Sequence, residues 1–378
     1  MAVAELTLRH PAGRCRILVG EGLLGSEIVA LEEVVGGRSV FLVSSGPVRR
    51  LHGERAATSL GGARRMIELE VADGEAAKSV AEASRLWSEM LRAGGKRDSV
   101  VVALGGGSVG DLAGFVAATF LRGVDFVQLP TTLLAQVDAS IGGKTGIDLA
   151  EGKNAVGAFH QPRLVIADVA TLATLDPGEL RSGLFEVIKK AALLDPGLLA
   201  TVECELDRLV RGEPEALVPV VTAAIAAKAA VVEQDPFESD RRRLLNFGHT
   251  LGHALEAALD YRGMRHGEAV GYGMLFALEL ASERSLSALD AERLRRLIRR
   301  LGLPPLPELS LEVVWSFLGR DKKARESGVA WVLPQAIGHG EITTSIPDAT
   351  VRGHLERFLT QGRARGRASA PTDGDGAQ

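Results

Sequence analysis

Three of the chain's eight histidines lie within the stretch 249–266, and their spacing is suited to metal chemistry. His249 and His253 are four positions apart in LLNFGHTLGHALE, and His266 follows in MRHGEAV. Residues four apart share one face of a helix. Two such histidines could bind one metal ion, or one could bind the ion while the other acts as an acid or base. The alternative is three unrelated core or surface residues.

Charged residues inside apolar helical segments provide further candidates. Glu186 lies in SGLFEVIKKAALL, where a charge is costly unless it is paired or coordinated, so we expect it to complete a three-ligand site with the histidines. Lys189, three positions later, would lie on the same side of the helix. Lys228 stands alone in AAIAAKAAVV, where a lysine that extends along apolar surface to water is the ordinary explanation.

A glycine-rich turn indicates a phosphate site in the first half. In VVVALGGGSVGDLAG, glycines 105, 107 and 110 match G-x-G-x-x-G, which lets backbone approach a pyrophosphate at a helix N-terminus. The match is weak alone, because its strand is about the fourth and the candidate acid, Asp125, begins the next strand. We expect a nucleotide site, and the alternative is a turn that only packs helix on strand.

Two further segments could contact an anion. LPTTLLAQ ends a predicted strand and places Thr131 and Thr132 at a helix start, as ligand contacts or as ordinary caps. The stretch 137–159 is expected to be a long loop, which carries Lys144 after two glycines and Lys153 followed by Asn154. Glycines beside lysines let backbone and ammonium groups converge on an anion, although surface lysines in a flexible loop are the alternative.

The order of the elements predicts where these residues are held. Strand-like runs at 16–20, 39–45, 65–70, 100–104, 126–130 and 163–168 alternate with helical stretches such as 79–94, which predicts a parallel sheet covered by helices. After Asp168 the segments 179–194, 214–234, 243–260, 267–284 and 290–301 are helical, and strands are expected only near 330–346. We therefore expect an α/β Rossmann-like nucleotide-binding domain over 1–177, a mostly α-helical metal- and substrate-binding domain over 178–361, and a disordered tail over 362–378.

Composition narrows the class of protein. The chain has 378 residues, 46% of them apolar, with a formal net charge of −4, so a nucleic-acid partner is not expected. Two isolated cysteines indicate neither a disulfide framework nor a thiolate metal site, and they fit the cytoplasm. The apolar stretch 100–121 is rejected as a membrane span because Asp111 lies at its centre. We expect small-molecule partners and no membrane.

The motifs together resemble one known family. GGGSVGD, RGVDFVQLPTTLLAQVDASIGGKTGID, EGKNAVGAF, FEVIKKA, RRRLLNFGHTLGHALEA, RHGEAVGYGM and DKK at 321–323 follow the order found in the 3-dehydroquinate synthases of the sugar-phosphate cyclase superfamily, over about residues 65–335. The resemblance implies a homodimeric lyase of the shikimate pathway that uses NAD and zinc, with Co²⁺ as an alternative metal. Such an enzyme converts 3-deoxy-D-arabino-heptulosonate 7-phosphate into 3-dehydroquinate and phosphate.

The resemblance also implies roles for individual residues. The implied zinc ligands are Glu186, His249 and His266. Implied nicotinamide-cofactor contacts are Asp73, Gly74, Glu75, Lys78, Gly106, Gly107, Ser108, Val109, Gly110, Asp111, Thr131, Thr132, Lys144, Lys153, Thr171, Leu172 and Thr174. Implied substrate contacts are Arg122, Asp138, Lys144, Lys153, Asn154, Lys189, Lys228, Arg242, Asn246, His253 and one of Lys322 or Lys323. Within these sets, His253, Lys144, Lys189, Asn246 and Arg242 would serve catalysis.

Departures and rivals bound this interpretation. Asp148 stands where many relatives have asparagine and Leu251 where phenylalanine is frequent, and neither residue is assigned to chemistry. Cyclases that make inosose or valiolone products usually alter the GGKTGI and GKN segments. A cyclase of an aminated substrate would have nearly the same pocket and stays open. A metal-dependent polyol dehydrogenase would have little use for so many anion-binding lysines, and an inactive binding protein would be expected to lack a ligand.

Overall fold

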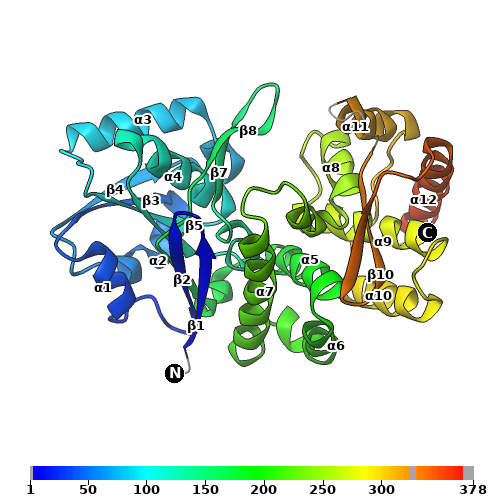
Figure 1. Cartoon of the computed structure of the whole chain (residues 1–378), viewed down its shortest axis with the longest axis horizontal. Helices are drawn as coiled ribbons and strands as arrows, with labels where there is room; N and C mark the ends of the chain where they lie inside the picture. Colours follow the sequence, from blue (N-terminus) through cyan, green and yellow to red (C-terminus); the bar gives the residue numbers. More distant parts are fainter. Residues whose placement is uncertain (1–2, 324–328, 369–378) are drawn as a thin grey trace, which may run out of the picture. The chain divides into compact units, whose positions relative to one another are not determined.

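A seven-stranded sheet forms the centre of the first part of the chain, in the order β1-β2-β9-β6-β5-β3-β4 (Figure 1). In the computed structural model, residues 3–323 and 329–368 are described, without the side chains of 320–323 and 362–368. The strands are β1 (Ala4–His10), β2 (Gly13–Gly20), β3 (Ser39–Ser45), β4 (Arg65–Val71), β5 (Val100–Gly105), β6 (Asp125–Pro130) and β9 (Leu164–Asp168). All neighbours pair in parallel except β1, which forms an antiparallel hairpin with β2.

Helices cover both faces of this sheet. Alternate residues of β3 point to opposite sides of the sheet. Val40 and Leu42 therefore pack in one core with buried side chains of α1 (Val29–Val35) and α2 (Gly46–Ser59). Phe41 and Val43 belong to the other core, with α3 (Val80–Arg92) and α4 (Gly107–Thr119). Short helical turns complete the layer: η1 (Gly74–Ala77), η2 (Phe120–Arg122), η3 (Ala135–Ala139) and η4 (Val169–Thr174). The expected doubly covered parallel sheet is confirmed.

The stretch 137–159 differs from the expected loop. It begins in η3 and continues as an antiparallel hairpin of β7 (Lys144–Leu149) and β8 (Gly152–Phe159), drawn in green in Figure 1. Gly146 and Gly157 are paired in this hairpin, and an added Cβ on Gly157 would overlap the carbonyl oxygen of Thr145. Glycine at these two positions therefore allows the two strands to approach closely.

The chain divides into two compact units, Met1–Lys190 with Ala200–Arg242, and Ala191–Leu199 with Arg243–Gln378. The first unit therefore extends beyond residue 177, where the loss of strand-like runs suggested a boundary. It includes most of α5 (Pro177–Leu194), most of α6 (Pro196–Val210) and all of α7 (Pro214–Gln234). The reason is packing, because α7 lies against β1, β2, η3 and η4.

The second unit is mostly helical. Its helices are α8 (His249–Ala258), α9 (His266–Ser282), α10 (Ala288–Leu301), α11 (Leu311–Lys323) and α12 (Asp348–Ala368), and its hairpin is β10 (Trp331–Ala336) with β11 (His339–Thr343). The helix expected over 243–260 is interrupted: the turn η5 (Arg241–Asn246) precedes Gly248, which has φ +80° and begins α8. The predicted tail starts too early, since α12 continues through Ala368, and residues 369–378 lie outside the described residues.

Helices α8 and α9 approach each other backbone to backbone. A Cβ added to Gly273 of α9 would overlap the carbonyl oxygen of Gly248, and one added to Gly252 would lie 3.2 Å from the Ala269 backbone. Close approach therefore requires glycine at Gly273, and a side chain at Gly252 would be a tight fit against the Ala269 backbone. The contact holds the start of α8 against the second turn of α9, and the rings of His249 and His266 lie 5.3 Å apart.

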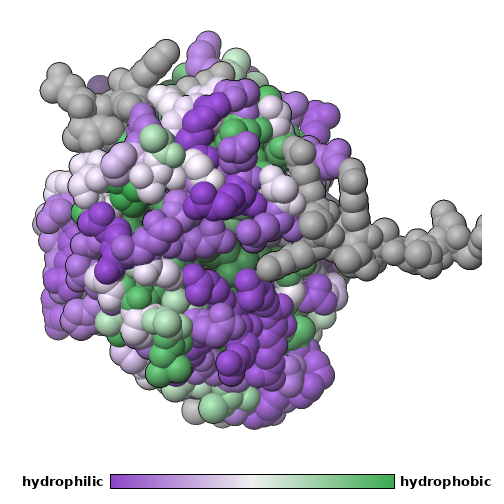
Figure 2. Space-filling model, turned by 90° about the vertical axis from the view of Figure 1, so that its right-hand side faces the viewer, coloured by the Kyte–Doolittle hydropathy of each residue, from purple (hydrophilic) through white to green (hydrophobic). Residues whose placement is uncertain are grey.

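One face of the molecule and one apolar helix bear on whether the chain could contact a membrane. Figure 2 shows one face of the second unit, where hydrophilic side chains predominate and apolar areas are small and separate. Among the described residues, α7 alone is long and apolar enough to cross a membrane. Of its most apolar stretch of 18 residues, 56% is buried inside the protein. The core helix of a soluble protein passes the same test, so α7 is weak support for a membrane span. Residues 100–121 form a strand and a separate helix instead of one long helix.

Candidate functional site

The glycine-rich turn joins β5 to α4 at the carboxyl edge of the sheet. Gly106 is the N-cap of α4, and it has no side chain that could accept a hydrogen bond from the N–H groups of the first turn. A Cβ on Gly105 would lie 2.8 Å from Cβ of Val109, and one on Gly110 would lie 2.6 Å from Oε1 of Gln128. Uncapped N–H groups at a helix start bind anions well, so this turn fits the pyrophosphate of a dinucleotide.

Two neighbouring strands end beside this turn. Thr131 donates its N–H to the carbonyl oxygen of Gly105 at 2.9 Å, and the Thr132 hydroxyl accepts from the N–H of Ala135 at 3.1 Å. Thr171 and Thr174 lie in η4, directly after β9, and both hydroxyls are hydrogen-bonded within that turn. The predicted cofactor residues of β5, β6 and β9 therefore share one edge of the sheet, including Ser108 and Leu172 in the same turns.

A buried lysine links three of the predicted cofactor and substrate residues. Nζ of Lys78 lies 2.8 Å from Oδ2 of Asp111 and also bonds the side chain of Asn154. Burial raises the pKa of Asp111 to about 6, against the effect of the neighbouring Lys78 cation. Burial alone lowers the pKa of Lys78, but the carboxylates of Asp111 and Glu75 outweigh it and the net shift is upward.

Asp148 belongs to this network although the sequence assigned it no role. Its Oδ1 accepts the N–H of Asn154 at 2.6 Å and lies 3.9 Å from Nζ of Lys78. Lys153 lies 3.6 Å from Glu75, a second link between the hairpin and the segment that holds Asp73 and Gly74. The sequence signal for Asp148 was only its departure from asparagine, which had no assigned consequence.

Asp138 lies among lysines in the same unit. Its Oδ1 is 2.8 Å from Nζ of Lys190 and 3.0 Å from Nζ of Lys228. Burial alone raises the pKa of Asp138, but the ammonium groups of Lys190, Lys228 and Lys189 hold it well below its usual value. Burial lowers the pKa of Lys228 to about 7, and the cations of Lys190 and Arg242 act in the same direction against Asp138.

Lys190 is a site residue that sequence reasoning missed. Glu186 is fully buried on α5, where it pairs with Nζ of Lys189 and lies 3.5 Å from Nζ of Lys190. Positions three and four residues after Glu186 share its helix face, so the same spacing that selected Lys189 could have selected Lys190. Lys228 does not reach toward open water, which was the ordinary expectation, but is buried against Asp138.

Arg242 and Lys144 are held by one loop of the first unit. The Arg242 guanidinium donates to the carbonyl oxygens of Gly142 at 3.1 Å and Pro236 at 2.8 Å. The Lys144 ammonium pairs with the carboxylate of Glu238. Arg122 instead is exposed at the end of η2, with φ 71°, and makes no ion pair within the described residues.

The histidines gather in the second unit. The rings of His249 and His253 have centroids 5.2 Å apart, and the His266 ring lies 5.3 Å from His249 and 6.1 Å from His253. Nδ1 of His266 is 3.2 Å from Oε2 of Glu256, a carboxylate that sequence reasoning missed. His253, Glu256 and His266 offer ligand atoms within 4.8 Å of one another, so this donor set fits a divalent metal.

The last three predicted substrate contacts, Asn246, Lys322 and Lys323, all lie in the second unit. Asn246 ends η5 in the second unit. Lys322 and Lys323 lie in the last turn of α11, and their side chains are outside the described part of the chain.

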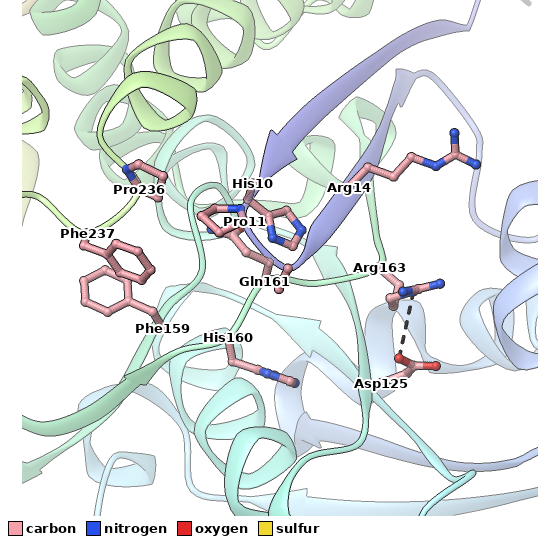
Figure 3. Close-up of a pocket in the computed structure, with 11 residues that line it drawn as sticks. His10, Pro11, Arg14, Asp125, Phe159, His160, Gln161, Arg163, Pro236 and Phe237 are labelled. Carbon is pink, nitrogen blue, oxygen red and sulfur yellow. Dashed lines mark ion pairs between the residues drawn. The ribbon is translucent and has the colours of Figure 1, made fainter.

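A separate cavity of about 240 Å³ lies in the first unit, between the β1–β2 turn and the segments around residues 160 and 237 (Figure 3). Phe159 and Phe237 face each other edge to face at its side, with centroids 5.4 Å apart. Arg163 points toward Asp125 at 3.9 Å. Asp125, the candidate acid of the nucleotide motif, lines this cavity, whereas no residue of the glycine-rich turn or of the lysine cluster does.

Known proteins resemble most of the chain. Models of the 3-dehydroquinate synthase N-terminal and C-terminal domains match residues 68–182 and 183–324. The 3-dehydroquinate synthase of Symbiobacterium thermophilum is 46% identical over 350 residues, which cover 91% of this chain and 97% of that relative.

Two solved structures share the fold. The 2-epi-5-epi-valiolone synthase of Streptomyces hygroscopicus, with NAD⁺ and Zn²⁺ bound, has a TM-score of 0.82 at 29% identity, covering 92% of this chain and 96% of its own. A 2-deoxy-scyllo-inosose synthase with carbaglucose-6-phosphate, NAD⁺ and Co²⁺ has a TM-score of 0.85 at 24% identity, covering 94% and 100%. Identity is much higher to the curated 3-dehydroquinate synthase than to either of these cyclases. The glycine-rich turn, the buried cations and this likeness agree, and the chain belongs to the 3-dehydroquinate synthase family.

Proposed function

We propose that the chain converts 3-deoxy-D-arabino-heptulosonate 7-phosphate into 3-dehydroquinate and phosphate, as a lyase of aromatic amino-acid biosynthesis. The observation that carries this proposal is a buried group of cations in a member of the family. Lys189, Lys190, Lys228 and Arg242 are almost fully buried in a chain whose net charge is negative. Two carboxylates, Asp138 and Glu186, pair with the three lysines, and no carboxylate among the described residues forms an ion pair with Arg242, so the group keeps an excess of positive charge. The phosphate and the carboxylate of the substrate could balance that excess.

The proposed cofactors rest on membership of the family and on the chemistry of the residues that the resemblance selects. We propose that NAD binds the segment 73–78, the GGGSVGD turn, Thr131, Thr132 and η4, and that zinc binds Glu186, His249 and His266. When bound, NAD accepts and returns a hydride at a ring hydroxyl, while the metal polarises the oxygen that becomes a ketone. Co²⁺ is the alternative metal, since it was present in a solved relative of the same fold.

The residues of the chain would bind, orient and shield the substrate. Lysines and Arg242 neutralise its phosphate and carboxylate, and a guanidinium can bind either group through two N–H donors. Asp138, held ionised by its lysines, can accept hydrogen bonds from substrate hydroxyls. His253, beside the proposed metal ligands, is proposed to contact substrate instead of metal. Ring opening and aldol closure then need chiefly a shaped pocket that excludes water.

We also propose a homodimer located in the cytoplasm. Two cysteines without a disulfide, Cys15 buried and Cys204 exposed, are compatible with a reducing compartment. Size-exclusion chromatography with light scattering tests the dimer.

The test of the function is phosphate release by purified protein with the heptulosonate phosphate, catalytic NAD⁺ and added Zn²⁺, with and without chelator. Release that requires both cofactors, forms dehydroquinate and leaves no net NADH is expected. NADH that accumulates in step with substrate would instead support a polyol dehydrogenase. Absence of release would favour another cyclase substrate, such as an aminated relative.

A further inference from the structure

Asp235 caps the end of α7 and collects hydrogen bonds from the loop that follows. Its Oδ1 accepts from the N–H of Ser239 at 2.9 Å and from the Ser239 hydroxyl at 3.0 Å. Its Oδ2 accepts from the N–H of Asp240 at 2.8 Å and of Arg242 at 3.0 Å. Asp235 is 6% exposed. One buried carboxylate therefore fixes the path of the chain from 235 to 242.

This loop ends at Arg242, whose guanidinium forms no ion pair with a carboxylate among the described residues. Arg242 is 2% exposed, and its side chain bonds only carbonyl oxygens, those of Gly142 and Pro236. Among the ion pairs of the described residues, none involves Arg242. A buried guanidinium in that state is costly by itself and well suited to an anionic ligand. Its position depends on a backbone N–H that Asp235 holds.

The same loop also reaches Lys144. Glu238 lies between the two ends of the capped segment, has φ 59°, and pairs with the Lys144 ammonium. The positive φ is unfavourable for glutamate and persists only where surrounding bonds hold the turn. The loop therefore contacts the segment 142–144 at two points: Arg242 donates to the carbonyl oxygen of Gly142, and Glu238 pairs with Lys144.

We propose that Asp235 is a positioning residue that sets the places of Arg242 and Lys144 for binding of the anionic substrate. The proposal rests on the proposed function for the identity of that substrate. Asp235 itself has all its carboxylate contacts within the loop, so it acts through the two cations. Its loss should weaken anion binding more than it slows the chemical step.

The central variant is Asp235→Asn, in which an amide nitrogen replaces one acceptor and faces N–H donors. We expect the KM for the heptulosonate phosphate to rise about tenfold, the scale of a lost hydrogen bond to a charged group, while kcat changes less. Asp235→Ala should give a larger rise. Ser239→Ala removes one of the four bonds, retains a stable loop and should raise KM in the same direction by a smaller factor.

The matched control is Asp195→Asn, because Asp195 caps α6 by accepting from the N–H of Gly197 at 2.9 Å and of Leu198 at 3.0 Å. It should lower the melting temperature without changing KM. Equal KM effects in the two asparagine variants at equal loss of melting temperature would mean a merely structural role and overturn the proposal.

A second readout does not depend on turnover. Inorganic phosphate binding, followed by calorimetry, should weaken in Asp235→Asn and Ser239→Ala but not in Asp195→Asn. Amide hydrogen exchange at 239–242 should accelerate in the same two variants. A wild-type protein that binds phosphate but releases none from the heptulosonate would contradict the proposed function alone. Unchanged phosphate affinity in Asp235→Asn would contradict the positioning role alone.

Discussion

Lys228 contacts Asp138 at two points: its Nζ lies 3.0 Å from the carboxylate and donates to the backbone carbonyl oxygen at 2.8 Å. The lysine comes from α7 and the aspartate from η3, so this double contact joins a long helix to the segment after β6. Nζ of Lys190 lies 2.8 Å from the same oxygen, Oδ1, so one carboxylate contacts two cations. Because these charges are buried or partly buried, changing one of them here or in the Lys78 network should change the free energy of unfolding.

Removing Lys190 should be strongly destabilising. Lys190→Met takes away the cation 2.8 Å from Asp138 and leaves buried carboxylates less compensated, which typically costs about 3–5 kcal/mol. Thermal unfolding and urea titration measure the loss. Lys96→Met is the control, because Lys96 is exposed and should change stability by less than about 0.5 kcal/mol. Similar stabilities of the two variants would show that Lys190 carries no structural charge balance.

Asp111 should give stability a distinct pH dependence. Its folded pKa of about 6 lies above the ordinary 3.8, so between these values the folded state holds the proton more tightly. This contribution to the free energy of unfolding therefore increases as pH falls from about 6 towards 4, and decreases as pH rises. The difference in stability between wild type and Asp111→Asn, measured by urea unfolding from pH 4 to 7, should show that slope. A difference independent of pH would mean that Asp111 titrates normally.

The metal assignment separates the neighbouring histidines. Glu186→Ala and His266→Ala should lose bound zinc and activity together, whereas His253→Ala should keep the metal and slow turnover. Elemental analysis of purified variants gives the metal content. Depleted His253→Ala with fully loaded His266→Ala would contradict the assignment.

Glu256 provides a graded case at the same centre. It lies 3.2 Å from Nδ1 of His266, and carboxylates that orient a ligating imidazole contribute about 10–100-fold in metal affinity. Glu256→Gln should therefore weaken zinc binding by about that factor without abolishing it, as measured by competition with a chelator. Complete loss of metal would indicate that Glu256 is itself a ligand.

The glycine turn should resist even one added methyl group. In Gly105→Ala the new Cβ would lie 2.8 Å from Cβ of Val109, which displaces the start of α4 and should cost about 1–3 kcal/mol. We expect weaker NAD⁺ binding in a fluorescence titration. Gly152→Ala is the control, because its added Cβ meets no atom within 4 Å. Unchanged affinity in Gly105→Ala would separate this turn from the cofactor.

Features carried by local sequence were predicted well. The strand-like runs appear as β2, β3, β4, β5, β6 and β9. β3, β5, β6 and β9 are nearly continuous buried segments, as expected for parallel strands, whereas β4 (RMIELEV) alternates and is only partly buried. The glycine turn and the histidine pair were found for the same reason, since each is contiguous. By contrast, β1 was not predicted, because its residues AELTLRH alternate between charged and apolar and its pairing depends on β2.

Residues whose roles depend on backbone donors were not predicted. Asp148 accepts the N–H of Asn154, and Asp235 accepts the N–H groups of Ser239, Asp240 and Arg242. Every residue except proline carries a backbone N–H, so the sequence does not mark which of them a carboxylate will bind. Lys190 was missed for another reason: two adjacent lysines follow Glu186 at helical spacing, and periodicity alone could not rank them. The two compact units divide at other residues than the expected boundary at 177, because α7 packs on the strands of the first unit.

The glycine contact between α8 and α9 has a consequence for how the protein can change over evolutionary time. Because Gly248 and Gly273 meet through backbone, the spacing of the imidazoles at the two helix starts does not depend on any particular apolar side chain. The surrounding core can exchange leucine for methionine or phenylalanine while the donor set keeps its geometry. Apolar positions around this contact are therefore expected to vary more freely than the glycines and the donor side chains.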